Sequence, residues 1–431
     1  MKRLLTIALL LAFLSGCRTS GPGIFGKQSP HEQYSKKLSD AGLKETALGG
    51  LWFSSAERAL AQPQTVSVPY RQTGYFADEN PRAVGLQFTS RRGQKLIFRL
   101  EKKPRTSFTI YTELWRVNSG RAPSLLTSMD TTATEFSHEV DDEQETFILR
   151  LQPELLRSGE YTLSISVGPS LGFPVSGKSA RVGSVWGDSR DAGARRHEGI
   201  DIFAPKRTPV IAAADGTVNR VEETTIGGKV VWLRPEGRPI NLYYAHLDEQ
   251  LVSAGQRVRL GDTLGLVGNT GNARTTPPHL HFGIYGFGGA INPLPYVEPN
   301  IKESPTVRVA ADKLNTYYRT VRDVQLADGL SLKKNSIVFA TDADAQFYMG
   351  ILADGRNVKI RADDIQQADN QILALKLRDS AAILEQPLAA SPAKQYIRTG
   401  TSVKVRGYYN DHALVSTEAG IEGWLPRRLL Q

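Results

Sequence analysis

The architecture of this chain follows first from one hexapeptide, His279-Leu280-His281-Phe282-Gly283-Ile284. Side chains alternate between the two faces of a β-strand, so His279, His281 and Gly283 share one face while the apolar residues between them enter a core. Two histidines about 7 Å apart on one face can reach a common centre, and the glycine leaves space beside them. An isolated pair of this kind is more often just exposed on a strand, so its meaning depends on the rest of the chain.

A second group of ligand-type residues lies upstream, in His197-Glu198-Gly199-Ile200-Asp201. Positions i and i+4 share a face on a helix and on a strand, so His197 and Asp201 can converge in either conformation. Gly199 and the β-rich residues after it favour an extended segment. Imidazole nitrogens and a carboxylate, with an open position for water, are the composition of a catalytic zinc site. The helical HExxH arrangement is excluded, because the residue four after His197 is an aspartate.

The histidines are clustered along the chain. Four of the seven (His197, His246, His279 and His281) fall between residues 197 and 281. Imidazole is a good zinc ligand and the usual acid–base group near neutral pH, so this clustering indicates a metal or catalytic site. The other three, His31, His138 and His412, are expected to be solvated.

Five motifs together resemble the lysostaphin/LytM-type zinc endopeptidases of bacterial cell walls. The resemblance covers residues 184–298 and implies a compact antiparallel β domain with a metal in an open groove. It also implies that His197, Asp201 and His281 are zinc ligands and that His246 and His279 are the unliganded catalytic pair. The motifs are Arg196–Pro205 (RHEGIDIFAP), Ala213–Val218 (AADGTV), Tyr244–Leu247 (YAHL), Gly268–Gly271 (GNTG) and Pro278–Gly283 (PHLHFG).

The function that follows is a membrane-anchored zinc metalloendopeptidase that hydrolyses peptide bonds of peptidoglycan, in cross-links or stems, through a zinc-activated water. His279 is the candidate general base, and His246 would stabilise the oxyanion or protonate the leaving amine; these two roles could be exchanged. A second reading is a non-catalytic LytM-like regulator that activates cell-wall amidases. A third is a wall-binding lipoprotein with a structural zinc, although structural zinc normally has four protein ligands.

The N-terminus reads as a targeting segment. Lys2 and Arg3 precede an apolar run that is too short to span a bilayer, which predicts a signal peptide over residues 1–16. Leu14-Ser15-Gly16-Cys17 resembles a bacterial lipobox, and this predicts lipidation of Cys17, the only cysteine in the chain. We therefore expect an exported, membrane-anchored lipoprotein. Arg18 favours the outer membrane, facing the periplasm, if the cell has two membranes.

The remaining regions predict a mainly β, multidomain chain. Residues 17–63 are interpreted as a tether followed by short helices that break near Gly42, and residues 64–170 as an antiparallel β-sandwich. Residues 305–385 and 390–431 predict two small β-barrels, the second resembling bacterial Src-homology-3-like domains. An offset of 65 residues brings four similar positions of these two regions into alignment. Trp232, Tyr243 and Tyr285 are interpreted as core or groove-wall residues.

The composition limits the classes of protein to which the chain can belong. The chain has 431 residues, 40% of them hydrophobic, and a formal net charge of +9, which excludes a multi-span membrane protein and a wholly disordered chain. Basic chains favour anionic partners without choosing among them. The charge and the motifs together predict peptidoglycan as the partner and a membrane contact through Cys17. They predict no nucleic-acid partner, and they allow a protein regulator. The extra domain before residue 184 motivates the hypothesis that it blocks the groove.

Overall fold

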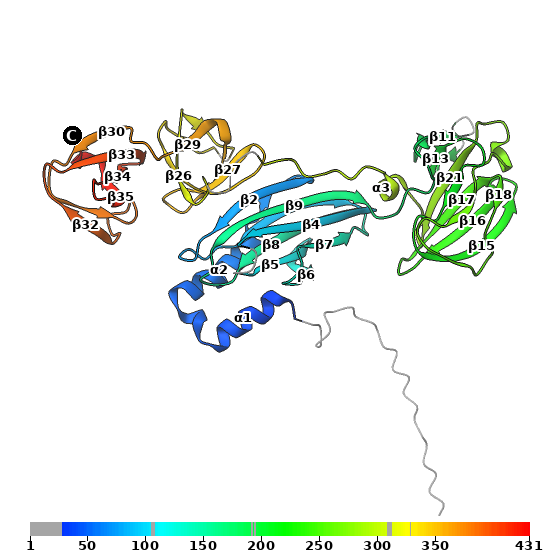
Figure 1. Ribbon diagram of the computed structural model, residues 1–431, viewed down its shortest axis with the longest axis horizontal. Coiled ribbons are helices and arrows are strands. Elements are labelled where there is room, and N and C mark those ends of the chain that lie inside the picture. The colour runs from blue at the N-terminus through cyan, green and yellow to red at the C-terminus, as the bar shows by residue number, and fades with distance from the viewer. Residues whose placement is uncertain (1–27, 105–107, 191–192, 194, 308–312, 328) are drawn as a thin grey trace, which may run out of the picture.

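The computed structural model describes residues 28–104, 108–190, 193, 195–307, 313–327 and 329–431 (Figure 1). The predicted signal peptide (1–16), Cys17 and the tether up to residue 27 lie outside the described residues. Within the described ranges, no helix combines the length and the apolar character that crossing a bilayer requires. The chain is mainly β, as predicted.

Two helices precede the first sheet. Helix α1 (Pro30–Asp40) begins with a capping box, in which the Ser29 side chain accepts from the Glu32 amide and the Glu32 side chain accepts from the Ser29 amide. Gly42, with a φ of 71°, ends this segment in a left-handed turn, and a short 3-10 turn η1 (Leu43–Glu45) leads into α2 (Ala47–Ala61). The predicted pair of helices broken near Gly42 is confirmed.

Residues 64–169 form the predicted sandwich. One sheet has the order β1-β3-β8-β5-β6, and the other contains β2-β9-β4-β7. Alternating residues from both sheets form one core that includes Leu86, Phe98, Phe147 and Leu163. The strands are β1 (Gln64–Thr65), β2 (Tyr70–Phe76), β3 (Val84–Arg91), β4 (Gln94–Lys103), β5 (Ile110–Asn118), β6 (Arg121–Ser128), β7 (Glu135–Glu139), β8 (Gln144–Pro153) and β9 (Gly159–Pro169).

A buried polar network fixes α1 on the sandwich. Arg150 on β8 forms an ion pair with Glu113 on β5 and donates to Nδ1 of His31 at 3.0 Å. Because arginine only donates, His31 must carry its proton on Nε2, which donates to Gln152 Oε1 at 2.6 Å. The prediction that His31 is solvated is wrong: its side chain is buried, since the helix closes over the sheet at this point.

The region that resembles a zinc peptidase forms a separate β unit. Its main sheet has the order β10-β13-β21-β17-β16-β15-β19, with β22 beside β21, and a second sheet has the order β14-β20-β18. The strands of the main sheet are β10 (Arg181–Ser184), β13 (Ile200–Phe203), β15 (Gly216–Thr224), β16 (Gly228–Pro235), β17 (Ile240–Leu247), β19 (Arg257–Val258), β21 (His279–Gly286) and β22 (Gly289–Ile291). Those of the second sheet are β14 (Pro209–Ile211), β18 (Glu249–Gln250) and β20 (Thr263–Leu266), and β11 (Ser189–Arg190) pairs with β12 (Arg195–Arg196).

The C-terminal part contains two related β units, as the 65-residue offset predicts. The elements β23, β26, β27, β28 and η5 of the first unit each begin 65 residues before β31, β33, β34, β35 and η6 of the second. The first unit has β23 (Thr316–Thr320), β24 (Val324–Gln325), β25 (Ser331–Leu332), β26 (Ile337–Ala343), β27 (Phe347–Ile351), β28 (Asn357–Arg361), η5 (Ala362–Asp364) and β29 (Ile365–Gln367). The second has β30 (Leu373–Lys376), β31 (Ala381–Leu384), β32 (Ala393–Ile397), β33 (Ser402–Tyr409), β34 (His412–Ser416), β35 (Glu422–Pro426) and η6 (Arg427–Leu429).

The predicted division of this region at 385–390 is wrong. Strands β30 and β31 pair with the sheet of the second unit, so that unit already begins by Leu373. The Pro- and Ser-containing segment after Glu385 looks like a linker in sequence. It is instead the turn between β31 and β32, closed by a hydrogen bond from the Glu385 amide to the Pro392 carbonyl.

The sandwich separates the two ends of the molecule (Figure 1). On one side, β2 pairs with β26 of the first C-terminal unit, and Arg82 beside β2 forms an ion pair with Asp342 at 2.8 Å. On the other side, Arg238 of the peptidase-like unit binds Glu139 of β7 at 2.6 Å. The chain after α3 (Leu294–Val297) returns along the sandwich, where Lys302 bridges to Val167.

Substitution of Arg150 by methionine tests the buried network. It leaves the Glu113 carboxylate buried without its partner, which costs about 3–5 kcal/mol. The matched control is Arg99→Met, which breaks an ion pair with Glu135 on the same sandwich. The side chains of Arg99 and Glu135 are 57% and 45% exposed, so this pair contributes less than about 1 kcal/mol to stability. Hydrogen exchange of β5 and β8 amides measures both costs; equal costs for the two variants would contradict the assigned role of the network.

Candidate metal and catalytic site

The register of β13 against β21 brings the two ligand motifs together. Asp201 pairs with His281, and Phe203 pairs with His279. The other face of β21 enters the core, where Leu280, Phe282 and Ile284 are completely buried, as the alternation predicts. His197 precedes β13, with its amide bound to the Asp188 carbonyl at 2.9 Å.

Three ligand atoms meet at one point. His197 Nε2 lies 3.0 Å from Asp201 Oδ1 and 3.0 Å from His281 Nδ1, and His281 Nδ1 lies 3.0 Å from Asp201 Oδ1. His197 and Asp201 are buried and His281 is partly buried. The three residues predicted as zinc ligands are therefore the ones that the fold assembles.

This triangle fits zinc. Tetrahedral zinc holds nitrogen and oxygen ligands at about 2.0–2.1 Å, which separates neighbouring ligands by about 3.3 Å. Two imidazoles and one carboxylate leave the fourth position for water, as in catalytic rather than structural sites. Burial by itself raises the pKa of Asp201, but the contacts with His197 and His281 outweigh it and hold that pKa well below its usual range, so the carboxyl is an anion.

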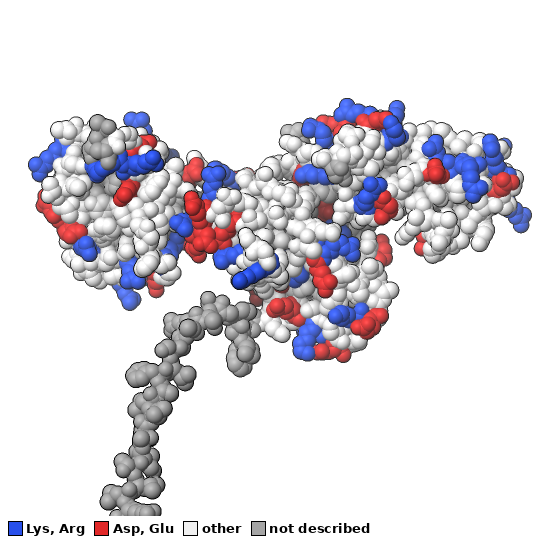
Figure 2. Space-filling view, turned by 180° about the vertical axis from the view of Figure 1, so that it is seen from behind, with Lys and Arg blue, Asp and Glu red and all other residues white. Residues whose placement is uncertain are grey.

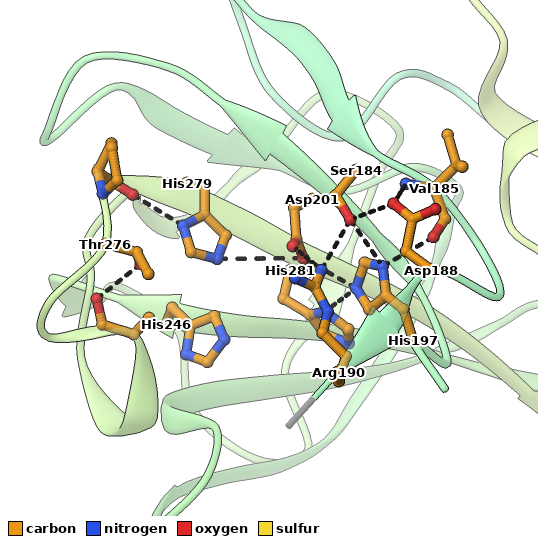
Figure 3. A network of polar contacts seen from close by, with 12 residues as sticks. Ser184, Val185, Asp188, Arg190, His197, Asp201, His246, Thr276, His279 and His281 are labelled. Carbon is orange, nitrogen blue, oxygen red and sulfur yellow. Dashed lines mark hydrogen bonds and ion pairs between the residues drawn. The ribbon is translucent and has the colours of Figure 1, made fainter. Parts of the chain in front are cut away.

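Groups behind the ligands fix their orientation (Figure 3). His197 Nδ1 donates to the Val185 carbonyl at 2.9 Å, which leaves the lone pair of Nε2 for the metal. Arg190 donates to Asp201 Oδ2 at 2.5 Å, so that Oδ1 faces the two imidazoles. Gly199 is required here, because a Cβ at this position would lie 2.5 Å from Cε1 of His281.

The two remaining histidines lie beside this triangle and face it. Nδ1 of His279 donates to the Pro277 carbonyl at 2.8 Å, and Nδ1 of His246 donates to the Thr270 carbonyl at 2.9 Å. In both residues the lone pair is therefore on Nε2. His279 Nε2 lies 4.0 Å from Asp201 Oδ1. The ring centroids of His246 and His279 are 5.1 Å apart. Burial, then the positive charges of His281 and His279, lowers the pKa of His246 to about 4.

His246 reaches the site by breaking the alternation of β17. Tyr244 faces the core and Ala245 faces the groove, so a regular strand would turn His246 back into the core. His246 instead has a φ of 63°, beside a register shift between β16 and β17, and its side chain also lines the groove. The Gly268–Gly271 motif supplies the carbonyl that orients it.

These residues line a groove of about 970 Å³. Its walls also include Arg195 and Arg196 and the aromatic residues Phe203, Trp232, Tyr243 and Tyr285. Every described residue that lines it lies between 184 and 285, so none comes from the sandwich, and the hypothesis of a blocking domain gains no support. On the face drawn in Figure 2, basic and acidic side chains are interspersed rather than gathered into one patch.

Comparison with known proteins agrees with this geometry. Residues 195–293 match the model of peptidase family M23. The region is 43% identical over 113 residues to an uncharacterized metalloprotease of Haemophilus influenzae (26% of this chain, 23% of that protein). It is 41% identical over 88 residues to the peptidoglycan DD-endopeptidase ShyC of Vibrio cholerae (20% of each chain).

Residues 195–293 form a peptidase family M23 domain. The resemblance predicted from the five motifs is thereby confirmed for this region. Among solved structures, the catalytic domain of lysostaphin from Staphylococcus simulans is 28% identical, with a TM-score of 0.26, and the match covers 27% of this chain and 92% of that domain. The chain spans less than a quarter of the length of the two curated relatives it matches here.

Sequence reasoning named the five histidine and aspartate side chains that the fold brings together but missed the groups that orient them. Arg190 gave no signal, because it is one arginine among many in a polar segment. The carbonyls of Val185, Thr270 and Pro277 are invisible to residue-type patterns, since every residue has one.

Zinc affinity separates the ligands from their neighbours. His281→Ala removes one of three ligand atoms, and we expect it to weaken zinc binding by more than about 100-fold. His279→Ala changes a neighbouring side chain of the same strand that is not in the triangle, and its zinc affinity should stay within about tenfold of the original. Competition against a chromogenic chelator measures both; equal losses in the two variants would contradict the ligand assignment.

Proposed function

We propose that the protein is a zinc metalloendopeptidase that hydrolyses peptide bonds of peptidoglycan, in cross-links or stems. One observation supports this most strongly: three ligand atoms converge in an open groove, with a further histidine nitrogen 4.0 Å from the carboxylate among them. The M23 match and the similarity to a peptidoglycan DD-endopeptidase support the substrate class.

The residues of the groove divide the work of amide hydrolysis. When bound, zinc supplies a water of lowered pKa and a charge that polarises the scissile carbonyl. His279 presents the Nε2 lone pair towards the ligand carboxylate and is placed to take a proton from the nucleophile. The ring centroid of His246 lies 5.1 Å from that of His279 and 5.9 Å from that of His281. Once its Nε2 has taken up a proton, His246 can donate it to the developing oxyanion or to the leaving amine.

The alternative is a non-catalytic regulator that activates cell-wall amidases. Such a role does not require the groove to hold a metal or a base. The complete set of ligands, of which His197 is oriented by a second hydrogen bond and Asp201 by an ion pair, favours the enzyme. The additional β units on both sides of the peptidase-like unit offer surfaces that a protein regulator of the enzyme could bind.

Digestion of purified peptidoglycan tests the activity and identifies the bond. The mature protein with zinc should release new peptide termini, which mass spectrometry of the fragments locates. Chelator should abolish cleavage, and His279→Ala should lower it by about 100-fold or more. His412→Ala, at a partly buried histidine of the last β unit, is the matched control and should retain activity. Absence of cleavage by the zinc-loaded protein would favour the regulator.

The location is a second part of the proposal. We infer an exported lipoprotein anchored through Cys17, facing the periplasm from the outer membrane if the cell has two membranes. The support is the sequence Leu14-Ser15-Gly16-Cys17 and the 12 residues from Arg18 to Ser29 that precede α1, which would act as a tether.

Cys17→Ser removes the thiol that lipidation requires. The variant should move from the membrane fraction to the soluble fraction, since the acyl chains that Cys17 would carry are the proposed anchor. Cell fractionation followed by immunoblotting measures the shift. A variant that stays in the membrane fraction in full would contradict the lipid anchor.

A further inference from the structure

Three aromatic side chains form a continuous surface on the groove side of the M23 sheet. We name Trp232, Tyr243 and Tyr285 the aromatic shelf. Trp232 on β16 pairs across the strands with Tyr243 on β17, and their ring centroids are 4.5 Å apart. Tyr285 on β21 completes the shelf, 5.3 Å from Trp232 and 6.0 Å from Tyr243.

The shelf is not part of the core. The neighbouring residues Leu233, Leu242 and Ile284 point to the opposite face and are completely buried, whereas the three aromatic side chains are half-buried and line the groove. The exposed faces of the three rings adjoin one another, so the shelf presents a contiguous apolar surface next to a polar site. Contiguous apolar surface in a groove indicates a ligand contact.

The shelf is held in place by its surroundings. The indole nitrogen of Trp232 donates to Glu222 Oε1 at 3.2 Å, which satisfies its polar edge and fixes the ring. Gly283 gives room for Tyr285, because a Cβ there would lie 2.9 Å from Cε2 of that ring. The glycine that the sequence placed beside the two histidines therefore makes space for an aromatic ring.

The shelf is continuous with the metal site. The rings of Tyr243 and His281 are 6.0 Å apart. Along β21, Tyr285 follows the ligand His281 by four residues, which is about 14 Å in an antiparallel strand. An extended peptide of about four residues has the same length.

We propose that the aromatic shelf binds a pyranose ring of the glycan strand, so that the groove holds the sugar and the stem peptide attached to it at the same time. This rests on the proposed function. The stem peptides of peptidoglycan consist of small, acidic and diamino residues, which offer little that stacks on aromatic faces. A pyranose ring has an apolar C–H face, and its hydroxyls can meet the tyrosine hydroxyls. One stem length then separates the sugar on the shelf from the peptide bond at the metal.

The test compares two substrates that differ only in sugar. One is a cross-linked muropeptide dimer with its disaccharides, and the other is the same dimer after an amidase has removed them. The intact protein should cleave the first with a kcat/KM higher by about tenfold. Trp232→Leu and Tyr285→Ser should each bring the ratio of the two kcat/KM values close to one. Phe287→Ser, at a fully exposed aromatic residue on the turn after Tyr285 that does not line the groove, should keep the ratio.

A binding measurement separates this proposal from the proposed function. Peptide-free glycan strands are titrated into chelator-treated full-length protein, and the change in tryptophan fluorescence is followed. We expect Trp232→Leu and Tyr285→Ser to weaken binding by about tenfold relative to Phe287→Ser. If no variant changes the binding and the ratio of the two substrates stays the same, the shelf does not contact sugar. If the protein cleaves neither dimer, the proposed function fails, and the binding result still decides the role of the shelf.

Discussion

The antiparallel register of β13, β21 and β17 is the constraint on which the rest of the site depends. It sets Asp201 opposite His281 and His281 opposite Ala245, so that residues 80 and 36 positions apart in sequence become neighbours. A slip of one residue would turn His279 and His281 into the core and Leu280 and Phe282 into the groove. The burial of the apolar face of β21 therefore stabilises the fold and positions the ligands with the same residues.

Backbone carbonyls orient the histidine rings that the strand register brings together. The carbonyls of Val185, Thr270 and Pro277 each accept a hydrogen bond from Nδ1 of one histidine, which leaves the lone pair of that ring on Nε2. His281 differs, because its Nδ1 is the atom that meets Asp201 and His197. The same type of side chain thus acts through different nitrogen atoms, and the surrounding hydrogen bonds decide which one.

Much of the fold and the membership of the site could be predicted from sequence, because both rest on periodicity and on residue chemistry. The alternation of 279–284 predicted the faces of β21, and the 65-residue offset predicted two related C-terminal units. The limits of those units were wrong, since the turn after Glu385 has the composition of a linker. The route of His246 into the groove depends on its left-handed backbone and on a strand irregularity, which no residue pattern encodes. The burial of His31 depends on contacts with residues more than 100 positions away.

The shelf and the metal site give the groove two chemically different ends, and only the metal end decides whether the protein is a hydrolase. The most direct test of that end is zinc-edge X-ray absorption of the zinc-loaded mature protein. Two imidazole nitrogens with oxygen ligands at about 2.0–2.1 Å, and no change in imidazole number in His279→Ala, are the predicted result. Three imidazoles, or a loss of one in His279→Ala, would contradict the division of the cluster into ligands His197, Asp201 and His281 and proton-transfer residues His246 and His279.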